Sequence, residues 1–220
     1  MTGPMILAID TATQYASLAL YGADGILAEE YWFSGRNHTV ELPARIDRML
    51  TKAGTSVSQL TALAVALGPG SFTGLRIGLA ITKGLALPYK LPVIGVPTLD
   101  IASQPYVESK LPVWTVGQAG RGRIFAACYG KRKDSWQVVV EPYITNLGDL
   151  SKRITRVSLV TGELDQEGIF LLQRNGKVRI ASAAERVRRA AYLAELAFDR
   201  LEAGEQDDPD ALIPIYLTTP

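Results

Sequence analysis

The chain has 220 residues, with 23 Lys and Arg against 22 Asp and Glu, and it contains one Cys and one His. An apolar fraction of 47% excludes wholesale disorder, and the length predicts one large domain or two small ones. A single Cys excludes an intrachain disulfide and fits a cytoplasmic protein, and a single His excludes any metal site with two His ligands. The longest apolar runs are too short to span a bilayer, and Met1–Asp10 is typical of a strand instead of a signal peptide, so we expect no membrane association.

Charge is distributed unevenly along a chain whose net charge is only +1. Basic residues, among them Arg121 and Arg123, are concentrated in 101–189, and acidic residues in 190–220. The basic segment could contribute to binding RNA phosphates. The other interpretation is a solvated surface that the acidic end balances, because no RNA-binding motif accompanies these charges.

The first hundred residues predict a mixed α/β layer. Strands are predicted over 6–10, 16–21, 26–33, 60–67 and 91–96. Helices are predicted over 39–53 and 74–87, which Gly54 and Pro88 end, and a short helix is predicted from Thr98. Three strands that lead into a helix, a strand, a helix and a strand are the order of an RNase H-like half.

The remaining residues predict a second α/β half. Strands are predicted over 113–116, 123–129, 137–142 and 157–160, and a long helix over 182–203. The Pro-containing segment 103–105 marks the break. We therefore expect halves at 1–103 and 104–220, with the long helix in the second.

A glycine-rich segment between the predicted strand 60–67 and the helix 74–87 is the most informative part of the chain. It reads Gly-Pro-Gly-Ser-Phe-Thr-Gly-Leu-Arg-Ile-Gly over 68–78. The segment does not match a Walker A loop, because Thr73-Gly74-Leu75 stands where that motif needs Gly-Lys-Ser/Thr. It does not match the dinucleotide-binding motif GxGxxG either, because its glycines are spaced GxGxxxG. Ser71 and Thr73 are interpreted as helix caps.

The helix 74–87 is apolar around most of its circumference. Gly78 and Gly84 would let another backbone approach closely. One face must cover the chain's own sheet, and the other is covered either by the second half or by another protein. Periodicity alone leaves both alternatives open.

Several segments together resemble the TsaB (YeaZ-like) family. The match is carried by the segment 68–78 with Lys83-Gly84-Leu85-Ala86, by Ile6–Thr13, by His38–Pro43, by Val93–Leu99 and by Pro214–Leu217. Gly117–Phe125 departs from the family's Ile-Asp-Ala-Arg-Arg pattern, since its carboxylate is missing, and Leu217 is not followed by the usual Arg.

The resemblance implies the actin-like ATPase (ASKHA) fold with two RNase H-like halves. It implies a non-catalytic scaffold subunit that pairs with a TsaD-like transferase to form N6-threonylcarbamoyladenosine at position 37 of tRNAs reading ANN codons. A TsaE-like ATPase would join the pair, with ATP or Mg²⁺ entering through these partners and tRNA bound only by the complex. Without its partner, the chain is expected to form a homodimer.

Two sets of residues are the candidate sites. The predicted partner interface consists of Leu42, Ile46, Met49, Leu75, Arg76, Gly78, Leu79, Thr82 and Lys83. A vestigial nucleotide site is predicted at Asp10, Thr11, Thr13, Gly68 and Gly70. Asp10 could hold Mg²⁺ through water or accept local backbone N–H groups in a turn. No catalytic residue and no resident cofactor or metal are predicted.

Three functions are compatible with these residues. The first is the scaffold subunit. The second is an independent ATP-binding enzyme of the actin-like superfamily that uses Asp10, Thr11 and the segment 68–74. The third is an RNA-binding protein that uses the basic segment.

Overall fold

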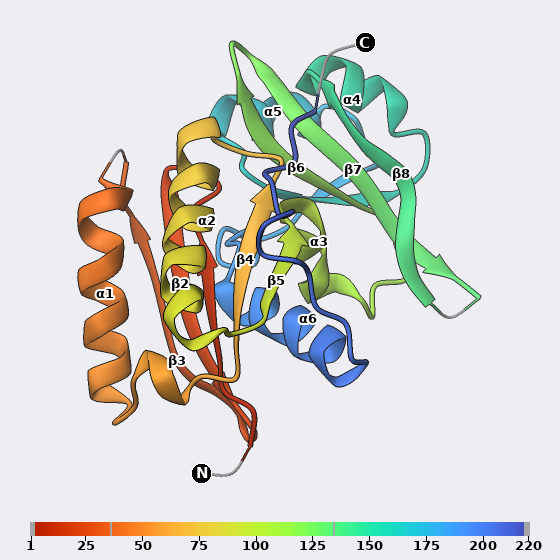
Figure 1. Cartoon of the computed structure of the whole chain (residues 1–220). Coiled ribbons are helices and arrows are strands. Elements are labelled where there is room, and N and C mark those ends of the chain that lie inside the picture. The colour runs from red at the N-terminus through yellow and green to blue at the C-terminus, as the bar shows by residue number, and fades with distance from the viewer. Residues whose placement is uncertain (1–2, 36, 134, 218–220) are drawn as a thin grey trace. The chain divides into compact units, whose positions relative to one another are not determined.

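The computed structural model describes residues 3–35, 37–133 and 135–217, and the chain divides into two compact units. Unit 1 comprises Met1–Ile101 and Arg189–Ile215, and unit 2 comprises Ala102–Arg188 and Tyr216–Pro220. Each unit is built around one five-stranded sheet (Figure 1). The predicted α/β class is confirmed.

The sheet of unit 1 has the strand order β3-β2-β1-β4-β5. β1 (Ile6–Asp10) pairs antiparallel with β2 (Tyr15–Gly22), and β2 pairs antiparallel with β3 (Gly25–Phe33). β4 (Ala62–Gly68) runs parallel to β1, and β5 (Val93–Pro97) runs parallel to β4. All five strands predicted for this half are confirmed, with small shifts at their ends.

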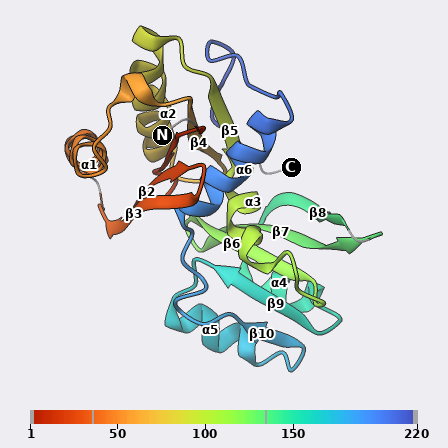
Figure 2. The ribbon, with the colours of Figure 1, turned by 90° about the horizontal axis from the view of Figure 1, so that it is seen from below.

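Helices cover both faces of this sheet. α1 (His38–Lys52) and α2 (Phe72–Ala86) pack on one face, and α6 (Ala190–Glu202) packs on the other (Figure 2). The short helix α3 (Thr98–Ser103) follows β5. Single 3₁₀ turns lie at Val57–Gln59, Leu87–Tyr89 and Gln104–Tyr106.

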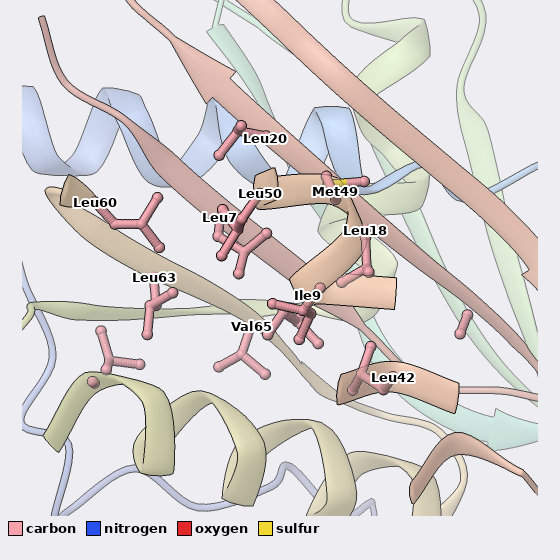
Figure 3. Packing of buried hydrophobic residues seen from close by; sticks show 14 of the residues in the cluster. Leu7, Ile9, Leu18, Leu20, Leu42, Met49, Leu50, Leu60, Leu63 and Val65 are labelled. Atoms are coloured by element: carbon pink, nitrogen blue, oxygen red, sulfur yellow. The ribbon is translucent and has the colours of Figure 1, made fainter. Parts of the chain in front are cut away.

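The two faces of the sheet differ in side-chain size because strand residues alternate between them. Towards α1, the strands present mainly branched side chains: Leu7, Ile9, Leu18, Leu20, Leu63 and Val65, which meet Leu42, Met49 and Leu50 of the helix (Figure 3). Towards α6, they present many alanines: Ala8, Ala19, Ala62, Ala64 and Ala66. The small side chains allow α6, itself rich in buried alanine, to lie close to the sheet.

The position of α6 corrects the predicted domain boundary. The helix begins at Ala190, not at 182, and it belongs to unit 1 and not to a C-terminal half 104–220. Glu29 of β3 holds its start, since the Glu29 carboxylate accepts the N–H of Ala191 and forms an ion pair with Arg189. The prediction failed because periodicity identifies the apolar face of a helix but not the sheet that this face covers.

Unit 2 repeats the connectivity of unit 1 without repeating its sequence. Its strand order is β10-β9-β6-β7-β8. An antiparallel meander of β6 (Val113–Gly120), β7 (Arg123–Arg132) and β8 (Ser135–Thr145) is followed by β9 (Ser158–Gly162), parallel to β6, and β10 (Val178–Ile180), parallel to β9. The four strands predicted here are confirmed, and β10 was not predicted.

Two helices of unit 2 were also missed. They are α4 (Leu147–Arg153) and α5 (Gln166–Gln173). Each starts at a side-chain cap that the sequence contains: Asn146 accepts the N–H of Asp149, and Asp165 accepts the N–H of Gly168. Both caps are signals that could have located these short helices.

The single cysteine lies in the core of unit 2. Cys128 belongs to β7 and is packed with Trp114, Ile124 and Leu150. Burial raises the pKa of its thiol to about 11, and the nearby Arg156 and Arg153 only partly oppose this effect. Because the thiolate is the reactive form, the native thiol is expected to be inert.

We predict that Cys128 does not react with a thiol reagent at pH 8 while the chain is folded. At that pH, roughly one thiol in a thousand is ionised if the pKa is about 11. The same reagent should label one thiol per chain after unfolding in guanidinium chloride. Stoichiometric labelling of the native chain within minutes would contradict this prediction.

Candidate functional site

Two loops meet at the end of the unit 1 sheet where β1 and β4 finish. The first connects β1 to β2 and contains Thr11, Ala12 and Thr13, and the second connects β4 to α2. The N–H of Ser71 donates to the carbonyl of Ala12 at 2.6 Å, and the hydroxyl of Thr11 donates to the carbonyl of Gly74 at 2.8 Å. The residues predicted as a nucleotide site are therefore brought to one edge of the sheet.

Asp10 makes a turn at this edge. Its side chain is 1% exposed, and its Oδ1 accepts the N–H of Ala12 at 2.9 Å. This geometry is the second of the two alternatives for Asp10, the acceptance of local backbone N–H groups.

The glycines of the segment 68–78 allow the two loops to pack backbone against backbone. A Cβ on Gly70 would overlap the carbonyl oxygen of Ala12, and a Cβ on Gly74 would overlap that of Thr11. A Cβ on Gly78 would overlap the Thr11 hydroxyl. Gly68 has a φ of +109°, a backbone conformation that favours glycine. Close packing explains the glycines at 70, 74 and 78, and the positive φ explains the glycine at 68.

The same packing occupies donors that a phosphate loop would offer to an anion. The N–H of Ser71 is donated to Ala12, and the N–H of Gly74 is donated to the Ser71 hydroxyl at 3.2 Å. The predicted cap at Ser71 is thereby confirmed. Nucleotide binding at Asp10, Thr11, Thr13, Gly68 and Gly70 stays a prediction.

Most residues of the predicted partner interface are buried inside unit 1. The seven with little or no exposed surface are Leu42, Ile46, Met49, Leu75, Gly78, Leu79 and Thr82. Their prediction as contact residues is wrong. The apolar periodicity of α1 and α2 marks the side that covers the chain's own sheet, and a partner can contact only the opposite side.

The two charged residues of the predicted partner interface, Arg76 and Lys83, differ in exposure. Arg76 is exposed, and its guanidinium carbon lies 3.8 Å from the centroid of the Phe72 ring. Lys83 is half-buried, and its Nζ donates to the carbonyl of Leu212 at 2.9 Å. Of the pair, Arg76 lies on the side of α2 that solvent reaches.

That solvent-facing side carries apolar and small residues. Val40 of α1 is 79% exposed and Phe72 of α2 is 55% exposed. Gly84 is exposed, and a Cβ on it would meet no atom within 4 Å. The helices α1 and α2 contact each other on one face of the sheet. The exposed side of α1 also carries the charged residues Asp47, Arg48 and Lys52. We name outer face the exposed apolar and small residues of the two helices together with Arg76: Val40, Ala44, Phe72, Arg76, Ala80 and Gly84.

The basic residues of unit 2 do not form one stripe along β7. Arg121 and Arg123 lie at the turn between β6 and β7, and Lys131 lies near the turn between β7 and β8. β7 has ten residues and separates the two turns by about 30 Å. Lys131 also pairs with Glu108 at 2.7 Å. This separation favours the interpretation of these charges as a solvated surface.

An aromatic cluster at the edge of unit 1 was not predicted. Tyr15 stacks on Tyr31 with ring centroids 5.2 Å apart, and Phe33 contacts Tyr15 edge-on at 5.2 Å. All three rings are exposed. The register Tyr15 opposite Phe33 and Ser17 opposite Tyr31 places them on one face, and this register is visible only once the strands are paired.

Within the described residues, no three His, Cys, Asp or Glu side chains gather as a metal site would need. None of the helices in the described part of the chain has the length and apolar character needed to cross a membrane.

Residues 6–199 match the family described as TsaD: tRNA N6-adenosine threonylcarbamoyltransferase. The Escherichia coli tRNA threonylcarbamoyladenosine biosynthesis protein TsaB is 48% identical over 99 residues, which cover 45% of this chain and 42% of that protein. The Bacillus subtilis TsaB is 27% identical over 217 residues, 96% of this chain and 93% of that protein.

A solved structure gives the same fold. The crystal structure of a Pseudomonas aeruginosa protein with similarity to peptidase YeaZ superposes with a TM-score of 0.80 at 23% identity, over 98% of this chain and 100% of that one. The two sheets are the RNase H-like halves of an actin-like ATPase fold. The chain belongs to the TsaD family, in its TsaB (YeaZ-like) branch.

We predict opposite effects for two glycine substitutions in α2. Gly78→Ala should destabilise unit 1 by about 1–3 kcal/mol, because the added methyl group overlaps the Thr11 hydroxyl. Gly84→Ala should stabilise the helix by about 1 kcal/mol, because its side chain enters open space and alanine is the better helix former. Urea unfolding followed by tryptophan fluorescence, to which Trp32 contributes from unit 1 and Trp114 and Trp136 from unit 2, and by circular dichroism measures both. Equal effects of the two changes would contradict the assignment of faces.

Proposed function

We propose that this chain is a non-catalytic subunit that pairs with a TsaD-like transferase and supports formation of N6-threonylcarbamoyladenosine at position 37 of tRNAs reading ANN codons. The outer face is the observation that carries the proposal. An exposed surface on two neighbouring helices that contains large apolar side chains such as Val40 and Phe72 is typical of a protein–protein contact. The TsaB relatives are named as threonylcarbamoyladenosine biosynthesis proteins, which supports the same assignment.

The residue composition supports a role without catalysis. A transferase site of the TsaD kind would need a pair of His ligands, and this chain has one His. The N–H of Ser71 donates to Ala12 of the other loop, and the N–H of Gly74 donates to the Ser71 hydroxyl, so these two N–H groups are already used within the chain, which argues against the alternative of an independent ATP-binding enzyme.

Further partners follow from the same proposal. A TsaE-like ATPase joins the pair, ATP and Mg²⁺ enter through the partners, and tRNA is bound by the assembled complex in the cytoplasm. When the transferase is absent, two copies of this chain associate through the outer face, since an exposed apolar surface is then left without its partner.

We predict that Ala80→Arg weakens the pairing with the TsaD-like transferase about tenfold to a hundredfold. Ala80 lies in the middle of the exposed side of α2, and a bulky charged side chain there overpacks the contact by about 1–3 kcal/mol. Isothermal titration calorimetry measures the affinity, and sedimentation should show the same variant losing any homodimer.

Two variants serve as controls for Ala80→Arg. Ala203→Arg adds the same charge at an exposed alanine that follows α6, and Arg121→Glu changes the charge at a turn of unit 2. Both should pair with the affinity of the unchanged chain. The interface assignment is wrong if Arg121→Glu breaks the pair while a folded Ala80→Arg chain binds normally.

We predict that the isolated chain transfers no threonylcarbamoyl group to tRNA and shows no metal dependence. Transfer to tRNA should appear only when the TsaD-like transferase is added, and mass spectrometry of the digested tRNA would detect the modified nucleoside. A metal-dependent transfer by the chain alone, or ATP hydrolysis that Asp10→Ala abolishes, would instead support the enzyme alternative.

A further inference from the structure

His38, the single histidine, is buried at the first residue of α1. Its side chain belongs to a residue that is 4% exposed, and its Nε2 lies 2.9 Å from the carbonyl oxygen of Thr13. Because a carbonyl only accepts hydrogen bonds, Nε2 carries the proton and donates it. No described residue supplies a partner for Nδ1, so within the described residues the ring is held by one hydrogen bond.

The start of α1 is attached to the rest of unit 1 at three places. The cap residue Asn37 makes no side-chain hydrogen bond to the helix. Its carbonyl accepts the N–H groups of Val40 and Glu41, which closes the first turn on itself. Attachment to the rest of unit 1 comes from the turn before α1, where Ser34 and Gly35 donate to the carbonyl of Gln14 at 2.9 Å, from His38, and from Glu41, whose carboxylate accepts the indole N–H of Trp32 at 2.7 Å. Of these, the hydrogen bonds of His38 and of the turn before α1 are the ones that reach the β1–β2 loop.

The loop that His38 reaches also holds the start of α2. The hydroxyl of Thr11 donates to Gly74, and the carbonyl of Ala12 accepts the N–H of Ser71. Thr13 then accepts from His38, and Gln14 accepts from the turn before α1. Thr11 and Ala12 of this loop therefore bond to the start of α2, and Thr13 and Gln14 bond to the start of α1 and to the turn before it.

Both anchored turns lead directly into the outer face. Val40 follows His38 by two residues, and Phe72 follows Ser71 by one. Since these two exposed side chains stand on helix starts that share one anchor, their relative placement depends on the loop 11–14.

We propose that His38 is a positioning residue for the outer face: its Nε2 hydrogen bond to Thr13 sets the first turn of α1 in register with that of α2. The proposal rests on the proposed function, because the outer face is the surface assigned there to the transferase. It differs from a contribution to folding alone, because it predicts lost affinity in a chain that remains folded.

Substitutions that keep or remove the Nε2 donor test the proposal. The amide nitrogen of Gln lies at nearly the distance of Nε2 from the backbone, whereas that of Asn lies nearer, at the place of Nδ1. His38→Leu and His38→Asn should weaken pairing with the TsaD-like transferase about tenfold, and His38→Gln should stay within about threefold of the unchanged chain. Affinity is measured by calorimetry at a temperature where circular dichroism shows each variant folded.

Thr61→Val is the matched control. It removes a hydroxyl that accepts the N–H of Met5 and donates to its carbonyl at the opposite end of β4. This change should lower resistance to urea and leave the affinity unchanged. A folded His38→Leu chain with unchanged affinity, or rescue by Asn as complete as by Gln, would overturn the proposal.

Hydrogen exchange of the isolated chain separates this proposal from the proposed function. In His38→Leu, amides in the first turn of α1 should exchange at least tenfold faster, whereas His38→Gln should restore their protection. If the unchanged chain does not bind the transferase at all, the proposed function fails, and unchanged exchange in His38→Leu would then independently refute the anchor.

Discussion

The contact between the β1–β2 loop and the start of α2 is the constraint on which the architecture of unit 1 depends. Two backbones lie so close that Gly70, Gly74 and Gly78 have no space for a Cβ against Ala12 and Thr11. Hydrogen bonds from Ser71 to Ala12 and from Thr11 to Gly74 satisfy the polar groups that this approach buries. Because the glycines serve this contact, a motif that looks suited to phosphate binding has a structural explanation within the chain.

That contact determines which sides of α1 and α2 remain available. Once the loop fixes the helix starts, Leu42 and Leu79 must face the sheet, and the opposite sides must face solvent. The core on the inner side can be packed densely without any contribution from a partner. Val40, with 79% of its surface exposed, adds little buried area to the core of unit 1, so its side chain is available for a contact outside the chain.

Local patterns in the sequence predicted the strands, α1 and α2, and the family, because these depend on neighbouring residues. They did not predict which side of α2 packs against the chain and which side faces solvent. Gly78 and Gly84 are both helical glycines, yet a Cβ on Gly78 would overlap the Thr11 hydroxyl, whereas a Cβ on Gly84 would meet no atom within 4 Å. The location of α6 and the stack of Tyr15 on Tyr31 likewise follow from pairings between distant segments. Buried contact residues were predicted as interface because an apolar stripe looks the same whichever surface covers it.

The two units show how one connectivity can serve different purposes. Both sheets have a three-stranded meander followed by parallel strands, but only unit 1 joins its first loop to two long helices. In unit 2 the corresponding turn between β6 and β7 carries Arg121 and Gly122 in left-handed conformations and projects charge to solvent. In unit 1 the loop between β1 and β2 forms hydrogen bonds with the starts of the helices that it positions, so contacts within the chain are sufficient to hold this loop in place.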